Sequence, residues 1–526
     1  MSTEKREHDW PLRLGTREDF ARVREAFRLA SFDDATVCRV LKIKDMSDLG
    51  AVDPLKTDIT SLISKADLSD VSGQLAFFIR AFLFLEFVAR EEVTRLFDRQ
   101  TIYSFLALDV LRIEASESDE ARYYTPAFIY PVGGFVVASD LYRNRDNSTF
   151  APPPDVVFPA IYSGTLRFLQ VISKSPVRDA IDLCAGSGIG ALALSRHVER
   201  AVSSDITERA SHFALFNKML NDCENVEVVC GDLYEPVKGR TFDRIVAHPP
   251  YMPALKSAVI WRDGGETGET LTRNIVAGLP EYLRPGGFFY TLCIGLDTKD
   301  APFEERARGW LGESASEFDV IFAAGQEQKP AQVAKNIAFR NKSYGNEEVA
   351  ELTGAFESAG ATSVVYGALV IHRRAEVEAE PLTIRAGFTS ATDGADFEWA
   401  IKWHHWRKQP RFSERLLQSR PRLAPHLHVT IKHTVEDGEL LPKDFVIETD
   451  KPFLAATRID GWIVPLIAEF NGQRTPVEIH AMAREAEAMP DDFQLEDFAP
   501  LLTLLVERGY LMLDDLALSD EESEAG

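Results

Sequence analysis

Apolar and polar residues follow two different periodic patterns along this chain of 526 residues. In 20–27 and 75–97, apolar residues recur at helical spacing. Two extended apolar runs follow, at 123–130 and 135–139, with a Gly-Gly pair between them as the turn. Residues 1–150 are therefore predicted to form a helical unit that ends in a two-stranded hairpin.

The middle of the chain changes to short apolar runs that alternate with helical stretches. Strands that alternate with helices in this way form parallel sheets. Residues 151–375 are therefore predicted to be an α/β domain with a doubly wound sheet. Four runs carry the prediction, and each ends at a polar residue: 180–181 before Asp182, 201–204 before Asp205, 226–230 before Gly231-Asp232, and 242–247 before His248.

A glycine-rich turn joins the first of these strands to a helix at 191–196. Residues Asp182 to Gly190 read Asp-Leu-Cys-Ala-Gly-Ser-Gly-Ile-Gly. Glycine has no Cβ, so a turn of this kind lets backbone N–H groups approach a polar or anionic cofactor closely. The turn by itself fits either a nicotinamide dinucleotide or S-adenosylmethionine (SAM), although its G-x-G-x-G spacing departs from the nicotinamide-type G-x-G-x-x-G.

The four strand-and-helix steps together resemble the class I SAM-dependent methyltransferases. The resemblance implies that Asp182 holds the methionine ammonium group, Asp205 the ribose hydroxyls and Asp232 the adenine amino group. A nicotinamide-binding Rossmann domain is the alternative. The residues assigned to the cofactor site are Asp182, Cys184, Ala185, Gly186, Ser187, Gly188, Asp205, Ile206, Asp232 and Leu233.

The fourth strand runs into His248-Pro249-Pro250-Tyr251. This tetrapeptide resembles the Asn/Asp-Pro-Pro-Tyr signature of methyltransferases that act on planar nitrogens, among them the release-factor glutamine methyltransferases and several RNA guanine and adenine methyltransferases. The resemblance implies that all four residues hold the acceptor, with hydrogen bonds to its –NH₂ group and a stacked aromatic ring. A loop at 264–265 should line the same pocket. Histidine replaces Asn or Asp here, so an oxygen, a sulfur or an aliphatic amine remains an alternative acceptor.

The last third of the chain is expected to hold two further segments and a tail. Residues 382–436 should be an irregular, basic connection, 437–514 a compact unit and 515–526 an acidic tail. A strand at 441–447, a helix at 461–467 and two later helices resemble the small winged-helix domains that present precursor peptides to modifying enzymes. The N-terminal helices and hairpin are likewise expected to be winged-helix-like.

The composition indicates which binding partners and which cellular compartment this protein is expected to have. The net charge of -24 disfavours long-range attraction to nucleic acid or to an anionic membrane. The N-terminus carries no apolar signal region, which favours a cytoplasmic protein without a membrane partner. Five cysteines are scattered without C-x-x-C spacing, so no metal site is predicted. Four histidines lack a carboxylate or cysteine at ligand spacing: His404, His405, His426 and His428.

These patterns predict a SAM-dependent enzyme that methylates a nitrogen of a peptide, protein or nucleic acid. Its fold class is α/β, with a doubly wound, Rossmann-like core between two winged-helix-like units. A small-molecule methyltransferase and a non-catalytic SAM-binding adaptor are the alternatives. The sequence does not specify an oligomeric state.

Overall fold

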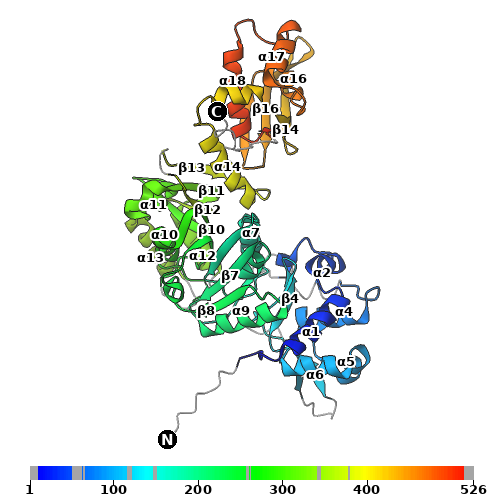
Figure 1. Ribbon diagram of the computed structural model, residues 1–526. Helices are drawn as coiled ribbons and strands as arrows, with labels where there is room; N and C mark the ends of the chain where they lie inside the picture. Colours follow the sequence, from blue (N-terminus) through cyan, green and yellow to red (C-terminus); the bar gives the residue numbers. More distant parts are fainter. Residues whose placement is uncertain are drawn as a thin grey trace, which may run out of the picture.

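The computed structural model is elongated, with three units in chain order (Figure 1). A helical N-terminal unit (blue to cyan) adjoins a central sheet (green), and a smaller C-terminal unit (yellow to red) extends from the far end of that sheet. The predicted acidic tail at 515–526 lies outside the described part of the chain. That part comprises residues 10–49, 62, 66–114, 121–145, 151–255, 260, 262–340, 345–376 and 380–513. No helix in these ranges is long and apolar enough to cross a bilayer.

The N-terminal unit is helical and ends in a hairpin, which confirms the prediction from its pattern. Helix α1 begins at Thr16, whose side chain forms a capping box with Asp19. A small sheet has the strand order β1-β3-β2, and β4 pairs with β5. Whether this unit is winged-helix-like stays a prediction. Its elements are α1 (Arg17–Leu29), α2 (Asp34–Leu41), η1 (Met46–Asp48), α4 (Gly73–Phe78), the π-helical turn η2 (Ile79–Leu83), β1 (Val88–Ala89), α5 (Arg90–Leu96), α6 (Arg99–Ala107), β2 (Arg112–Glu114), β3 (Arg122–Tyr124), β4 (Phe128–Val132) and β5 (Phe135–Ser139).

The hairpin β4–β5 docks on the central domain through two asparagines. Asn217 belongs to helix α9 (Glu208–Leu220), and Asn221 directly follows it. Asn217 accepts a hydrogen bond from the Ala138 amide at 2.7 Å and donates one to its carbonyl at 2.9 Å. Asn221 makes the same pair of bonds with Val136, at 3.0 and 2.8 Å. The two amide side chains therefore continue the hydrogen bonding of the β5 edge, as a neighbouring strand would.

The central domain contains an eight-stranded mixed sheet with the order β13-β11-β12-β10-β9-β6-β7-β8. Strands β6 to β10 run parallel, and β12 is antiparallel to both of its neighbours. The chain order reverses between β6 and β9, which is the switch point where open α/β sheets bind ligands at their carboxyl ends. The strands are β6 (Val177–Leu183), β7 (Val198–Asp205), β8 (Val226–Cys230), β9 (Phe242–Ala247), β10 (Leu283–Thr298), β11 (Phe318–Gln328), β12 (Ala361–Arg373) and β13 (Thr383–Gly387).

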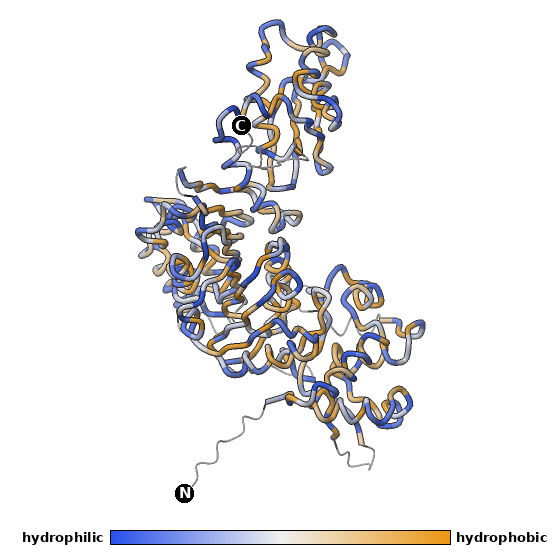
Figure 2. The backbone as a smooth tube through the Cα atoms, viewed as in Figure 1, coloured by the Kyte–Doolittle hydropathy of each residue, from blue (hydrophilic) through white to orange (hydrophobic). Residues whose placement is uncertain are grey.

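Helices cover both faces of this sheet, and the strands carry long apolar stretches (Figure 2). Along β9, Ile245 and Ala247 pack in the core with α10 and α11, whereas Val246 packs on the opposite face with α7 and α8. This alternation explains why the strand is apolar at consecutive positions. The remaining helices are α7 (Ser163–Val171), α8 (Ile189–Ser195), η3 (Glu235–Val237), α10 (Thr270–Tyr282), α11 (Phe303–Gly309), η4 (Gly312–Glu317), α12 (Pro330–Arg340) and α13 (Asn346–Ser358).

The C-terminal unit is a three-stranded antiparallel sheet followed by three helices, and the predicted strand at 441–447 and helix at 461–467 are both present. Helices α17 and α18 confirm the two later helices. The prediction of an irregular connection at 382–436 is wrong, because this segment holds β13, two helices and two strands. The elements are α14 (Gly394–Trp406), α15 (Phe412–Gln418), β14 (Arg422–Leu423), β15 (His428–Glu436), β16 (Glu439–Thr449), β17 (Ala455–Ile459), α16 (Ile463–Ala468), α17 (Pro476–Glu485), α18 (Leu495–Glu507) and β18 (Leu511–Met512).

Helix α14 is shared between two hydrophobic cores. Its first half contributes Phe397 and Ile401 to the core of the central sheet. Its second half contributes Trp403 and Trp406 to the core of the C-terminal unit. The sequence looked irregular here because a helix that is buried on several sides lacks the apolar stripe of a surface helix.

Candidate active site

The glycine-rich turn lies between β6 and α8, as the sequence predicts. Asp182 ends up beneath the turn with 1% of its surface exposed, and its carboxylate accepts a hydrogen bond from the Ala191 amide at 2.9 Å. Burial, together with the nearby charge of Asp205, raises the pKa of Asp182 to about 8, against the opposing effect of the α8 amides. In this geometry Asp182 caps the start of α8 from below.

Two glycines of the turn have positive φ angles but different surroundings. Gly186 has φ +54°, and a Cβ added there would meet no atom within 4 Å. Gly188 has φ +81°, and its added Cβ would lie 2.9 Å from the Cβ of Ala214 on α9. Gly188 is therefore required for packing, whereas Gly186 borders open space, where a ligand can approach the backbone.

The second and third acids lie at the ends of the next two strands, also as predicted. Asp205 accepts hydrogen bonds from the amide of Gly186 at 2.9 Å and the amide of Thr207 at 3.1 Å. Burial raises the pKa of Asp205, and these bonds partly offset that rise. Asp232 is exposed beyond β8. Asp182, Asp205 and Asp232 thus lie in a row at the carboxyl ends of the neighbouring strands β6, β7 and β8.

The remaining predicted cofactor residues line the same edge. Leu183 of β6 pairs with Ser204 of β7, and the Ala185 amide then donates to the Ser204 carbonyl at 3.1 Å. Ile206 has 55% of its surface exposed, and Leu233 has φ +45°. Cys184 also has a positive φ angle, and Ser187 is buried.

The proline loop lies beside the glycine turn. Leu183 at the end of β6 pairs with Ala247 at the end of β9, so the two loops leave neighbouring strands at the same level. His248 stacks on Phe168 of α7, with ring centroids 5.1 Å apart and planes 15° apart. Its Nε2 is buried and has no hydrogen-bond partner within the described residues. Burial lowers the pKa of His248 to about 4, so the ring is neutral at physiological pH.

Tyr251 extends this aromatic cluster toward β12. Its ring centroid lies 5.8 Å from that of His248 and 5.7 Å from that of Tyr366. Gly164 on α7 faces both side chains: a Cβ there would lie 3.4 Å from the Tyr251 hydroxyl and 3.8 Å from His248 Nε2. The loop thus packs two rings against α7.

The predicted partner loop around Gly264 and Gly265 holds the proline loop in place. The Gly264 amide donates to the Met252 carbonyl at 2.8 Å, and the Ala254 amide donates to the Gly265 carbonyl at 2.9 Å. A Cβ on Gly264 would lie 2.7 Å from the Pro250 carbonyl oxygen. Glycine is needed at this position because the two backbones touch.

Four contributors to the site were not found from the sequence. Phe168 and Gly164 belong to α7, which shows no motif, and Tyr366 lies more than 100 residues beyond the proline loop. Asn217 is fully buried and donates to the Ser187 carbonyl in the glycine turn at 2.9 Å. A buried asparagine in the apolar helix α9 was the available signal, since such a side chain must find polar partners.

Comparisons with known proteins agree with this geometry. Residues 159–294 match the family model described as "Methyltransferase small domain". The release factor glutamine methyltransferase of Thermodesulfovibrio yellowstonii is 32% identical over 123 residues, which cover 21% of this chain and 44% of that protein. The ribosomal protein uL3 glutamine methyltransferase of Bradyrhizobium diazoefficiens is 30% identical over 165 residues, which cover 29% and 52%. The release factor glutamine methyltransferase of Geobacter sulfurreducens is 30% identical over 152 residues, which cover 26% and 53%.

The chain spans about half the length of the curated relatives it matches. The matched stretch contains the glycine turn, the three acids and the proline loop, and it ends within β10. Residues 159–294 therefore match the small methyltransferase domain, as the glycine turn and the proline loop led us to expect.

Proposed function

We propose that this chain transfers the methyl group of SAM to the side-chain amide nitrogen of a glutamine in a protein or peptide. The relatives named above act on glutamine in release factors and in ribosomal protein uL3. The observation that carries the proposal is the buried Nε2 of His248, which has no hydrogen-bond partner in the described part of the chain and lies beside Gly164 and the ring of Tyr251.

The residues at the strand ends fit SAM. The open space over Gly186 suits the close approach of a ligand to the backbone, and Asp205 beside it suits the ribose hydroxyls. Asp232 is exposed and available to the adenine amino group. The carboxylate of Asp182, once it is ionised, can accept a hydrogen bond from the ammonium group of the methionine. When bound, SAM supplies a methyl group that its sulfonium has already activated.

The chain's own contribution to transfer is positioning. With its proton on Nδ1, the neutral imidazole of His248 accepts a hydrogen bond at Nε2 from one N–H of the target amide. Tyr251 stacks on the amide plane, and the proline-rich backbone leaves the carbonyl after His248 free to accept from the second N–H. Two such hydrogen bonds fix the amide plane and so hold its nitrogen in a single orientation.

Histidine differs from Asn or Asp in one respect that matters for this proposal. A low pKa makes His248 a poor proton acceptor near neutral pH, so it acts through its hydrogen bond and not as a general base. A side-chain carbonyl offers the same acceptor function, and asparagine should therefore replace His248 with activity retained. A leucine of similar volume offers no acceptor.

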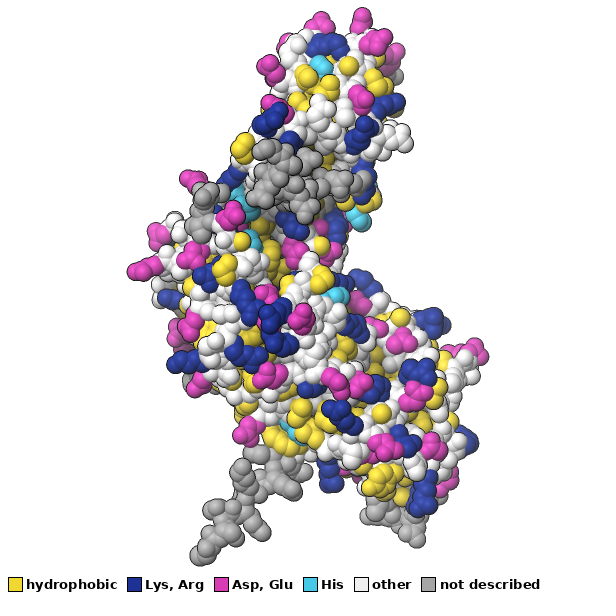
Figure 3. Space-filling model, in the orientation of Figure 1, with side chains coloured by type: hydrophobic (Ala, Val, Ile, Leu, Met, Phe, Trp, Pro, Cys, Tyr) yellow, Lys and Arg dark blue, Asp and Glu magenta, His cyan; other side chains and the backbone are white. Residues whose placement is uncertain are grey.

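The flanking C-terminal unit is proposed to recruit the acceptor, as a winged-helix-like peptide-binding module. The hairpin β15–β16 exposes several apolar side chains, including Val435 (69% exposed) and Leu440 (70%). On the face in Figure 3, Lys and Arg side chains are mixed with Asp and Glu. Together with the net charge of -24, this mixture favours a protein or peptide over a nucleic acid as the acceptor.

Transfer of isotope-labelled methyl groups from SAM into proteins of the source organism tests the proposal. Peptide mass spectrometry should find the label on a glutamine side chain, and nuclease treatment should leave it in place. His248→Leu should bind SAM normally but transfer about a hundredfold more slowly, and His248→Asn should stay active. Label in nucleic acid, or full activity in His248→Leu, would overturn the assignment.

A further inference from the structure

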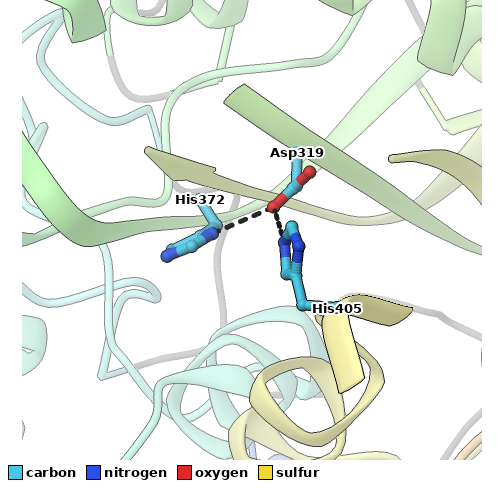
Figure 4. Close-up of side chains that lie close together, drawn as sticks. All are labelled: Asp319, His372 and His405. Carbon is cyan, nitrogen blue, oxygen red and sulfur yellow. Dashed lines mark hydrogen bonds and ion pairs between the residues drawn. The ribbon is translucent and has the colours of Figure 1, made fainter. Parts of the chain in front are cut away.

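A buried carboxylate lies between two imidazoles where the central sheet meets the C-terminal unit (Figure 4). Asp319 is the second residue of β11, and its cross-strand partner is His372 on β12. The Oδ2 atom of Asp319 lies 3.1 Å from Nδ1 of His372 and 2.8 Å from Nε2 of His405, in the last turn of α14. All three atoms lie within 4.8 Å of one another.

The surroundings fix the carboxylate in this orientation. Its other oxygen, Oδ1, accepts a hydrogen bond from the Leu382 amide at 2.8 Å. The His372 ring is held by Phe288, with centroids 4.5 Å apart. Metal ligands in proteins are usually oriented by such neighbouring hydrogen bonds and packing contacts.

The carboxylate of Asp319 is fully buried and pairs with no Arg or Lys side chain in the described part of the chain. The nearby guanidinium of Arg308 donates instead to the hydroxyl of Thr383 and to three backbone carbonyls. Within the described residues, the ion-pair partners of Asp319 are the two histidines alone. A fully buried carboxylate of this kind is stabilised by a cation at the same point.

We propose that Asp319, His372 and His405 bind a divalent transition-metal ion of the zinc class. Two imidazole nitrogens and one carboxylate oxygen are a ligand set typical of Zn²⁺ and Co²⁺, with a fourth position left for water. Ligand atoms about 2.0–2.2 Å from a tetrahedral ion are about 3.3–3.6 Å apart, so the carboxylate moves slightly away from both rings when an ion enters. Each histidine binds as the neutral ring, with its proton on the nitrogen that faces away from the ion.

Such an ion would take no part in methyl transfer, because it lies at the end of the sheet opposite the active site. His372 pairs with Phe288, which is level with Arg244 in β9. The acceptor loop begins beyond Ala247, at the other end of that strand. The ion would join α14 to two strands of the sheet, and α14 belongs to both hydrophobic cores. Metal binding therefore fixes how the C-terminal unit is held against the methyltransferase domain.

Titration of the chelator-treated, full-length protein with Co²⁺ and with Zn²⁺ alone tests this site. We expect one ion per chain, with the intense visible absorption of four-coordinate Co²⁺. His405→Gln and Asp319→Asn should weaken binding by at least about a hundredfold. His404→Gln is the matched control, since its ring lies on the same helix, 5.3 Å from that of His405, and outside the cluster. It should bind as tightly as the wild type.

Two results would overturn the proposal: a wild-type protein that binds no stoichiometric ion, or binding that is unchanged in His405→Gln. Circular dichroism and SAM binding confirm that each variant is folded. If Asp319→Asn fails to fold, His372→Gln supplies the second ligand variant. The test is independent of the methyl acceptor, so a failed transfer assay leaves it unaffected.

Discussion

Alanine at Gly186 separates the cofactor role of the glycine turn from its structural role. Gly186 has φ +54° and open space where a side chain would begin, whereas Gly188 has φ +81° and touches Ala214. Alanine at either position must adopt the left-handed conformation. Only at Gly186 does the new methyl group point into the space proposed for SAM.

The expected magnitudes differ accordingly. Left-handed backbone costs an L-residue about 1–2 kcal/mol, so Gly186→Ala should lower Tm by roughly 2–8 °C. Gly188→Ala adds overpacking of about 1–3 kcal/mol against α9 and should lower Tm further. In Gly186→Ala the new methyl group clashes with bound SAM and not with α9. A clash of the same size, about 1–3 kcal/mol, weakens SAM binding by about 5- to 150-fold.

Calorimetric titration with SAM and thermal unfolding measure these two effects. Gly312→Ala is the matched control, because Gly312 has φ +63° and also meets no atom within 4 Å of an added Cβ, yet lies in η4 away from the turn. It should lose a similar amount of stability and bind SAM normally. SAM affinity equal to wild type in Gly186→Ala would refute the placement of the cofactor over this glycine.

Two further predictions concern buried polar groups near the turn. Because burial and the charge of Asp205 raise the pKa of Asp182 to about 8, the unliganded protein should lose stability as the pH rises from about 4 to 8, and SAM should bind more tightly over the upper part of that range. Asp182→Asn should flatten both slopes, measured by unfolding and SAM titration, and a wild-type SAM affinity independent of pH would exclude this role. Asn217→Leu removes three hydrogen bonds to Ala138 and Ser187 and should cost roughly 3 kcal/mol or more, which chemical denaturation would measure; an unchanged unfolding midpoint would contradict it.

Much of the site could be predicted because its parts are local. The strand, the glycine turn and the helix from Val177 to Ser195 are adjacent in sequence, and an acid at a strand end needs no distant partner to be recognised. The surroundings of His248 could not be predicted in the same way. Phe168 reaches it from 80 residues away in the chain, and Tyr366 reaches the neighbouring Tyr251 from 115 residues away; neither carries a motif.

The segment at 382–436 shows the same limit. Its histidines and tryptophans do not form the apolar stripe of a surface helix, because α14 is buried between two hydrophobic cores. Among the described residues, the candidate metal cluster takes one ligand from each of β11, β12 and α14. Ligand spacing along the chain therefore carried no signal for it.

The sequence by itself determined the strands and helices between residues 177 and 247, the glycine turn, the acids at the strand ends and the proline loop. These features follow from backbone geometry and from the periodicity of apolar residues over short stretches. Only the tertiary structure decided that Asp182 lies beneath α8, that the buried Nε2 of His248 has no partner among the described residues, and that His405 meets Asp319. Burial and long-range contacts set those outcomes, because the charge, pKa and partners of a side chain depend on which distant segments pack around it.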